Sequence, residues 1–166
     1  MNATDTHSHS VEQHDPFAVA PATSPRIVVG MDGSDASLDA LRRGITMATA
    51  LNGSLHAVTV WHYPIMLAGS GALAWSPEQD AKAISKAAID AVFGGNPPEW
   101  FDATVREGSP AAVLIEESAD ADMLIVGSRG NGGFVGLLLG SVSSACAAHA
   151  HCPVLVIHGP QVPHKK

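Results

Sequence analysis

The stretch 127–141, GSRGNGGFVGLLLGS, decides the fold, because it places a glycine-rich loop between a strand and a helix. The apolar run 123–126 (MLIV) before it is typical of a fully buried strand, and a helix is expected over 142–150. Such a loop brings backbone N–H groups and a helix N-terminus together, which suits a phosphate group. No Gly-Lys-Ser/Thr sequence occurs in the chain, so the loop is not a P-loop.

Strands and helices alternate along the rest of the chain. Helix starts are marked by Ser34, Ser76-Pro77 and Ser109-Pro110, and the first two helices are expected to stop at Asn52-Gly53 and Gly94-Gly95. Strands are expected over 27–30, 54–62, 100–106, 123–126 and 154–157. The order βαβαβαβαβ predicts an α/β fold with a doubly wound, five-stranded parallel sheet covered on both faces.

Length and composition predict one domain. The chain has 166 residues, of which 46% are hydrophobic. Residues 1–25 lack both Lys and Arg and show no helical or strand period, so we expect a disordered N-terminal arm, a domain over 26–160 and a short tail over 161–166. No signal peptide and no apolar run of about 20 residues is visible, so we expect a cytoplasmic protein that does not bind membranes.

Net charge restricts the partners. The formal charge is −7, which argues against a nucleic-acid surface because such a surface needs a basic field. A polyphosphate would therefore be held by local donors, by a helix terminus or together with a divalent metal.

The spacing of Gly127, Gly130, Gly140 and Ser141 resembles the ATP-binding signature of the universal stress protein family. Supporting segments are RIVVGMDGS (26–34), GSP (108–110), DMLIVGSR (122–129) and CPVLVIH (152–158), so that the resemblance covers 26–158. It implies a Rossmann-like sheet of strand order 3-2-1-4-5, ATP as the ligand, and a homodimer that pairs through the C-terminal strand. It also implies a stress-response regulator that acts through unknown protein partners.

The expected nucleotide site combines the glycine loop with two residues that follow from the resemblance. Asp32 would contact the ribose or organise Mg²⁺ or Mn²⁺, and the backbone of Val60 would read adenine. No residue is expected to be catalytic, and no protein side chains are expected to hold a metal by themselves. The predicted cofactor-binding residues are Asp32, Val60, Gly127, Ser128, Arg129, Gly130, Gly140, Ser141 and Val142.

Other functions stay open at this stage. Slow ATP hydrolysis or nucleotidyl transfer would suit a related α/β fold, but no HxGH-like or KMSKS-like element is present. Cyclic AMP would fit the same phosphate cradle. Cys146, His149, His151 and Cys152 could suggest a metal cluster, yet a buried cysteine and histidines near a helix C-terminus explain them more simply.

Overall fold

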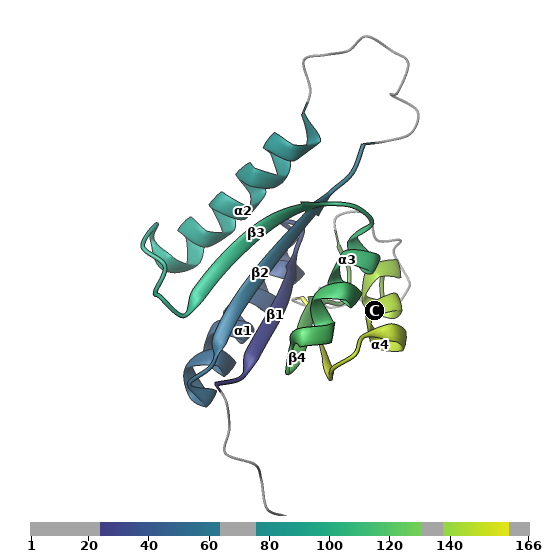
Figure 1. Cartoon of the computed structure of the whole chain (residues 1–166). Helices are drawn as coiled ribbons and strands as arrows, with labels where there is room; N and C mark the ends of the chain where they lie inside the picture. The colour runs from purple at the N-terminus through teal and green to yellow at the C-terminus, as the bar shows by residue number, and fades with distance from the viewer. Residues whose placement is uncertain (1–23, 64–75, 131–137, 160–166) are drawn as a thin grey trace, which may run out of the picture.

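The computed structural model describes residues 24–63, 76–130 and 138–159. Its centre is a parallel sheet of order β3-β2-β1-β4-β5, which confirms the predicted topology (Figure 1). The strands are β1 Arg26–Met31, β2 Ser54–Trp61, β3 Phe101–Glu107, β4 Met123–Gly127 and β5 Val154–Ile157. The expected arm and tail lie almost entirely outside the described residues, and so does the loop 64–75.

Four helices connect the strands. They are α1 Asp35–Leu51, α2 Pro77–Phe93, α3 Pro110–Glu117 and α4 Ser141–His149, and a short 3-10 turn, η2 Ser118–Asp120, follows α3. Strand bounds differ from the sequence prediction by one residue at most, and β3 begins at Phe101 rather than at 100.

Local sequence explains where the helices begin and end. The Ser34 hydroxyl accepts a hydrogen bond from Ser37 N–H at 3.2 Å, and Asn52 ends α1 in the left-handed conformation with a φ of 50°. Ser76 caps α2 in the same way as Ser34 caps α1, and Gly94 ends it with a φ of 63°. By contrast, Ser109 makes no side-chain cap on α3.

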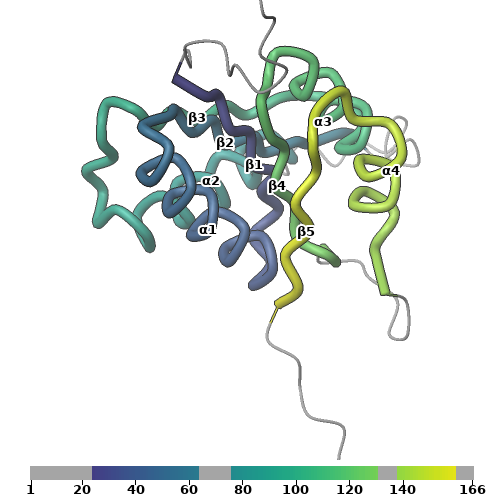
Figure 2. Tube along the Cα trace, turned by 90° about the horizontal axis from the view of Figure 1, so that it is seen from below, coloured from purple at the N-terminus to yellow at the C-terminus, as the bar shows by residue number. Residues whose placement is uncertain are grey.

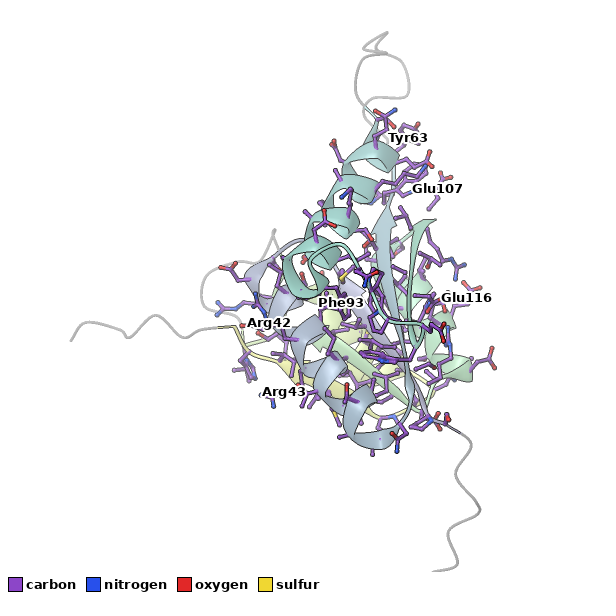
Figure 3. All side chains as sticks on the ribbon, turned by 90° about the vertical axis from the view of Figure 1, so that its left-hand side faces the viewer. Arg42, Arg43, Tyr63, Phe93, Glu107 and Glu116 are labelled. Carbon is purple, nitrogen blue, oxygen red and sulfur yellow. The ribbon has the colours of Figure 1, made fainter. Side chains whose placement is uncertain are left out.

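The helices form a layer on each face of the sheet. Figure 2 shows α1 and α2 on one side and α3 and α4 on the other. Side chains alternate accordingly along β1: Ile27 and Val29 join the core under α1 and α2, whereas Val28 joins the core under α3 and α4. On the solvent side of α1, Arg42 and Arg43 point outward (Figure 3).

The carboxyl ends of the strands gather at one end of the molecule. β1 pairs with β4 as well as with β2, so the strand order reverses between β1 and β4. Tyr63, just after β2, and Glu107, the last residue of β3, mark the same end (Figure 3). Ligands of doubly wound sheets bind at such a switch point.

Candidate functional site

A cavity of about 460 Å³ lies at this switch point. Its walls come from the carboxyl ends of β1, β2 and β4, from α3, and from the start of α4. The lining residues are Gly30, Met31, Asp32, Ser34, Ser37, Val58, Val60, Pro110, Leu114, Val126, Gly127, Arg129, Gly130, Gly140, Ser141, Val142 and Ser143. One side is apolar, and the other carries hydroxyls, a carboxylate and a guanidinium, which is the usual make-up of a small-molecule site.

Eight of the nine residues predicted from the sequence line this cavity. They are Asp32, Val60, Gly127, Arg129, Gly130, Gly140, Ser141 and Val142. They come from the turn after β1, from the ends of β2 and β4, from the residues that flank the glycine loop and from the start of α4, so the fold assembles residues that are as much as 110 positions apart in the chain. Their contacts with a nucleotide stay predictions, because the cavity shows where they lie and not what they bind.

Ser128 is the exception among the nine. Its side chain is 2% exposed, and its N–H donates to Ile157 O at 2.7 Å. Its own carbonyl accepts hydrogen bonds from Gly140 N–H at 2.7 Å and from Ser143 Oγ at 2.8 Å. Ser128 therefore joins the end of β4 to β5 and to the start of α4, and its backbone N–H is not directed at a ligand in the cavity.

The three glycines of the signature differ in what surrounds them. A Cβ on Gly127 would lie 3.0 Å from backbone and side-chain atoms of Ala36, so the close packing of α1 on β4 favours glycine there. A Cβ on Gly130 would overlap with Asp32 Oδ2. A Cβ on Gly140 would make only ordinary contacts, the nearest being Ser128 O at 3.5 Å. The fold itself therefore leaves room for a side chain at Gly140.

Asp32 lies where β1 turns into α1. Its Oδ1 accepts hydrogen bonds from Ser34 N–H at 3.0 Å and from Ser34 Oγ at 2.6 Å, while Oδ2 lies toward Gly130. Asp32 is the one acidic side chain among the cavity-lining residues that the structure describes. The carboxylate thus stabilises the helix entry and also faces the glycine loop.

The start of α4 supplies backbone donors. Gly140 is the N-cap and makes no side-chain cap, and Ser144 N–H donates to Gly140 O at 3.0 Å. The N–H groups of Ser141, Val142 and Ser143 belong to the first turn, which has no acceptors within the helix. Together with the dipole of a nine-residue helix, these groups favour an anion at the cavity edge.

Arg129 is exposed and borders two hollows. It lines the main cavity, and with Gly33, Asp35, Ala36 and other residues it also lines a second hollow of about 450 Å³ at the start of α1. An exposed guanidinium at this point can pair with a phosphate from either side.

The apolar wall of the cavity was not predicted from the sequence. This wall is made by Val58 on β2 and by Pro110 and Leu114 on α3. Val58 lies two residues before Val60 on the same face of β2, which is a signal that the sequence already carried. Leu114 carried no such signal, because its place in the wall depends on how α3 crosses the sheet.

No metal cluster is found where the sequence suggested one. Within the described ranges, no three His, Cys, Asp or Glu side chains are grouped so that they could hold an ion. Burial raises the pKa of Cys146 to about 11 and raises that of Cys152 as well, so both thiols are poor ligands and nucleophiles at neutral pH.

The described helices include none that is long and apolar enough to cross a membrane.

Comparison with known proteins identifies the family. A family model for the universal stress protein family matches residues 24–158. The chain belongs to this family. A universal stress protein of Methanocaldococcus jannaschii is 30% identical over 147 residues, which cover 82% of this chain and 83% of the relative. One from Mycobacterium tuberculosis is 34% identical over 146 residues, covering 80% of this chain but only 47% of the relative, so the chain spans about half the length of that protein.

Solved structures of the family share the fold. UspA from Lactobacillus plantarum aligns with a TM-score of 0.62 and 21% identity over 82% of this chain and 99% of that chain. A universal stress protein solved in complex with cAMP aligns with a TM-score of 0.63 and 28% identity, covering 84% of this chain and all of that chain.

Proposed function

We propose that this universal stress protein binds an adenine nucleotide, in the first place ATP, in the cavity at the switch point. The observation that carries the proposal is the position of the glycine loop and the α4 N-terminus on one side of a cavity whose other side is apolar. Phosphate suits the first side and a base suits the second. The volume of about 460 Å³ lies within the range of small-molecule sites.

A divalent cation fits the polar side of this site. Asp32 offers a carboxylate, and Ser34 and Ser141 offer hydroxyls, which are the oxygen ligands that Mg²⁺ or Mn²⁺ prefer. The ion would neutralise phosphate charge, and the phosphates would supply most of its ligands, since the protein brings only one acidic side chain among the described lining residues. Asp32 would either help to hold this ion or accept hydrogen bonds from the ribose hydroxyls instead.

Binding without efficient catalysis is part of the proposal. The carboxylate of Asp32 is hydrogen-bonded to Ser34, and no histidine is among the residues described as lining the cavity. We therefore expect a nucleotide-dependent regulator in the stress response, with hydrolysis slow at most.

Cyclic AMP is the second candidate ligand. It is favoured by the relative solved in complex with cAMP, which is 28% identical and covers 84% of this chain. Both ligands share adenine and ribose, and they differ in how many phosphates must face the glycine loop and α4.

Pairing of two copies through β5 is also proposed. β5 is an edge strand, and its four apolar residues are all partly exposed. An apolar edge of this kind favours pairing with a second strand, and a two-fold axis would allow β5 to pair with its own copy.

The nucleotide can be identified directly. The purified protein is denatured and any released nucleotide is identified by mass, and calorimetry then compares ATP, AMP and cAMP with and without Mg²⁺. Tighter binding of ATP supports the first candidate, and tighter binding of cAMP supports the second. No detectable binding of any of the three at millimolar concentration would contradict the proposed function.

A further inference from the structure

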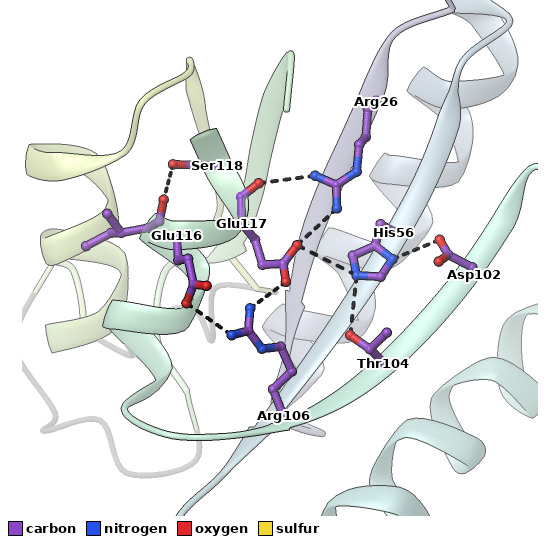
Figure 4. A network of polar contacts seen from close by, with 9 residues as sticks. Arg26, His56, Asp102, Thr104, Arg106, Glu116, Glu117 and Ser118 are labelled. Atoms are coloured by element: carbon purple, nitrogen blue, oxygen red, sulfur yellow. Dashed lines mark hydrogen bonds and ion pairs between the residues drawn. The ribbon is translucent and has the colours of Figure 1, made fainter. Parts of the chain in front are cut away.

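A second group of polar residues lies outside the cavity, where the end of α3 meets the sheet (Figure 4). At its centre is Glu117, the last residue of α3. Its Oε2 accepts a hydrogen bond from Arg26 of β1 at 3.0 Å, and its Oε1 accepts one from Arg106 of β3 at 2.7 Å. Its backbone carbonyl accepts a further bond from Arg26 at 3.2 Å.

His56 of β2 completes the surroundings of this carboxylate. Its Nε2 lies 3.9 Å from Glu117 Oε2 and 3.3 Å from Thr104 Oγ1, and its Nδ1 lies 2.8 Å from Asp102 Oδ1. Residues from three neighbouring strands therefore converge on the end of one helix. Charge-assisted hydrogen bonds of this kind fix a geometry more strictly than apolar packing does.

The Glu117 side chain is only 15% exposed, so its contacts are poorly screened. Burial alone would raise its pKa, but the hydrogen bonds from Arg26 and Arg106 outweigh burial and lower that pKa below the ordinary value of 4.5. Glu117 is therefore ionised at neutral pH, and loss of its charge would leave two arginines without their shared partner.

α3 depends on contacts with the rest of the fold, of which the packing of Val113 and Leu114 in the core is one part and the hydrogen bonds of Glu117 are another. The helix has eight residues, its N-cap Ser109 makes no side-chain hydrogen bond, and its last turn has no basic residue. A helix this short is not stable by itself in water. Ser118, the residue after Glu117, makes a second connection. Its Oγ donates a hydrogen bond to Ile115 O at 2.6 Å and accepts one from His151 N–H at 2.9 Å. His151 lies between α4 and β5.

The anchored helix carries the apolar wall of the cavity. Leu114 and Pro110 lie one and two turns before Glu117, and both line the cavity. Contact between α3 and β1 is close, because a Cβ on Gly30 would lie 2.8 Å from Leu114 Cδ1. A small displacement of α3 would therefore change the width of the cavity between Leu114 and β1.

We propose that Glu117 is a positioning residue for nucleoside binding: by holding the end of α3 to β1, β2 and β3, it fixes Leu114 and Pro110 at the apolar side of the cavity. This inference rests on the proposed function and adds a determinant of affinity that touches no ligand. The glycine loop serves the phosphates, whereas Glu117 serves the part of the ligand that packs against α3.

The test compares Glu117→Gln with Glu116→Gln. Glu116 is the neighbouring acid, whose side chain is 68% exposed and pairs with Arg106 at 3.0 Å, so the control removes the same charge from the same helix. Calorimetry well below the melting temperature measures adenosine, AMP and ATP. We expect Glu117→Gln to weaken all three by the same factor, roughly three- to tenfold, and Glu116→Gln to stay within about twofold of wild type.

A double-mutant cycle separates positioning from stability alone. If Glu117 acts through Leu114, the loss caused by Glu117→Gln should shrink in a Leu114→Val background and stay unchanged in a Gly140→Ala background. If Glu117→Gln does not fold, Arg106→Gln removes one of its two arginine partners and should weaken adenosine in the same direction.

Three results would overturn the inference. One is unchanged affinity in Glu117→Gln and Arg106→Gln with only a lower melting temperature, another is a loss confined to ATP, and the third is full additivity with Leu114→Val. Wild-type protein that binds neither these three ligands nor cAMP would refute the proposed function and this inference together, whereas normal wild-type binding with unaffected variants would refute this inference alone.

Discussion

The carboxylate of Asp32 lies against the α-carbon of Gly130, so that a side chain at position 130 would overlap with Asp32 Oδ2. This contact joins the end of β1 to the glycine loop that follows β4, across the point where the strand order reverses. It explains part of the need for glycine at this position without any ligand. A substitution at Gly130 therefore disturbs Asp32 as well as the loop.

Gly140 is the cleaner probe of phosphate binding. A Cβ at this position makes only ordinary contacts within the protein, so Gly140→Ala should melt within a few degrees of wild type. If phosphate approaches the α4 N-terminus as proposed, the added methyl group should weaken ATP by roughly tenfold and leave adenosine unchanged. Calorimetry with both ligands measures this, and equal ATP affinity would remove Gly140 from the phosphate site.

Gly127 provides the contrasting control. Its Cβ would meet Ala36 at 3.0 Å, so Gly127→Ala is expected to lower the melting temperature whether or not the protein binds nucleotide. On this proposal glycine occurs in one signature for two different physical reasons, which are packing at Gly127 and ligand access at Gly140.

Sequence reasoning predicted the strands and the helix ends well, and it did less well on the cavity wall. Buried strands such as 123–126 and 154–157 are continuous apolar runs, and caps such as Ser34 and Asn52 act locally, so each is visible in a few residues. Leu114 was visible only as one apolar residue of a helix. Its role in the cavity depends on the path of α3 over Gly30, which no local pattern encodes.

Ser128 shows a second limit of pattern reasoning. Its place between Gly127 and Arg129 suggested a ligand contact, but the direction of its N–H is set by pairing with β5. Likewise, the partners of Glu117 come from strands 91 and 11 positions away in the chain, so the charges of Arg26 and Arg106 gave no indication of the anchor.

Acid should destabilise the protein partly through Glu117. Because the pKa of Glu117 is lower in the folded protein than its ordinary value of 4.5, its contribution to stability is complete above about pH 4.5 and is lost as pH falls through the folded pKa. Glu117→Gln should therefore be less stable than wild type at neutral pH, and the difference should shrink as pH falls below about 4.5. Thermal melts across this range measure it. A difference that stays constant with pH would show that the charge of Glu117 does not stabilise the fold.

Dimerisation can be tested on one backbone N–H group of β5. Leu124 N–H donates to Pro153 O at 2.9 Å, and Ser128 N–H donates to Ile157 O at 2.7 Å. Because backbone groups alternate in direction along a strand, the N–H and C=O groups of the odd-numbered residues in β5 face β4. The backbone groups of Val154 and Val156 therefore face the open edge. Val156→Pro should keep the β4–β5 ladder and convert a dimer to monomer in light scattering.

Leu155→Pro is the matched control for that experiment. It replaces a backbone N–H group that faces β4 with a proline ring, so it should disrupt the β4–β5 pairing and lower the melting temperature strongly. A wild-type protein that is monomeric at high concentration, or a Val156→Pro variant that remains dimeric, would contradict pairing through β5.

Asp32 allows the most direct test of how the nucleotide is oriented. Its Oδ1 already accepts two hydrogen bonds from Ser34, so Asp32→Ala would disturb the entry of α1 as well as any ligand. Asp32→Asn keeps an oxygen for Ser34 and removes only the charge, which makes it the better variant.

We expect the carboxylate of Asp32 to accept hydrogen bonds from the ribose hydroxyls, because these are neutral donors, whereas phosphate would be repelled. Loss of a charge-assisted hydrogen bond costs about 1.5–3 kcal/mol, so the affinity for both AMP and ATP should fall by about tenfold or more, with or without Mg²⁺. A loss seen only for ATP with Mg²⁺ would instead assign Asp32 to the cation, and affinities within about twofold of wild type under all conditions would restrict Asp32 to the turn between β1 and α1.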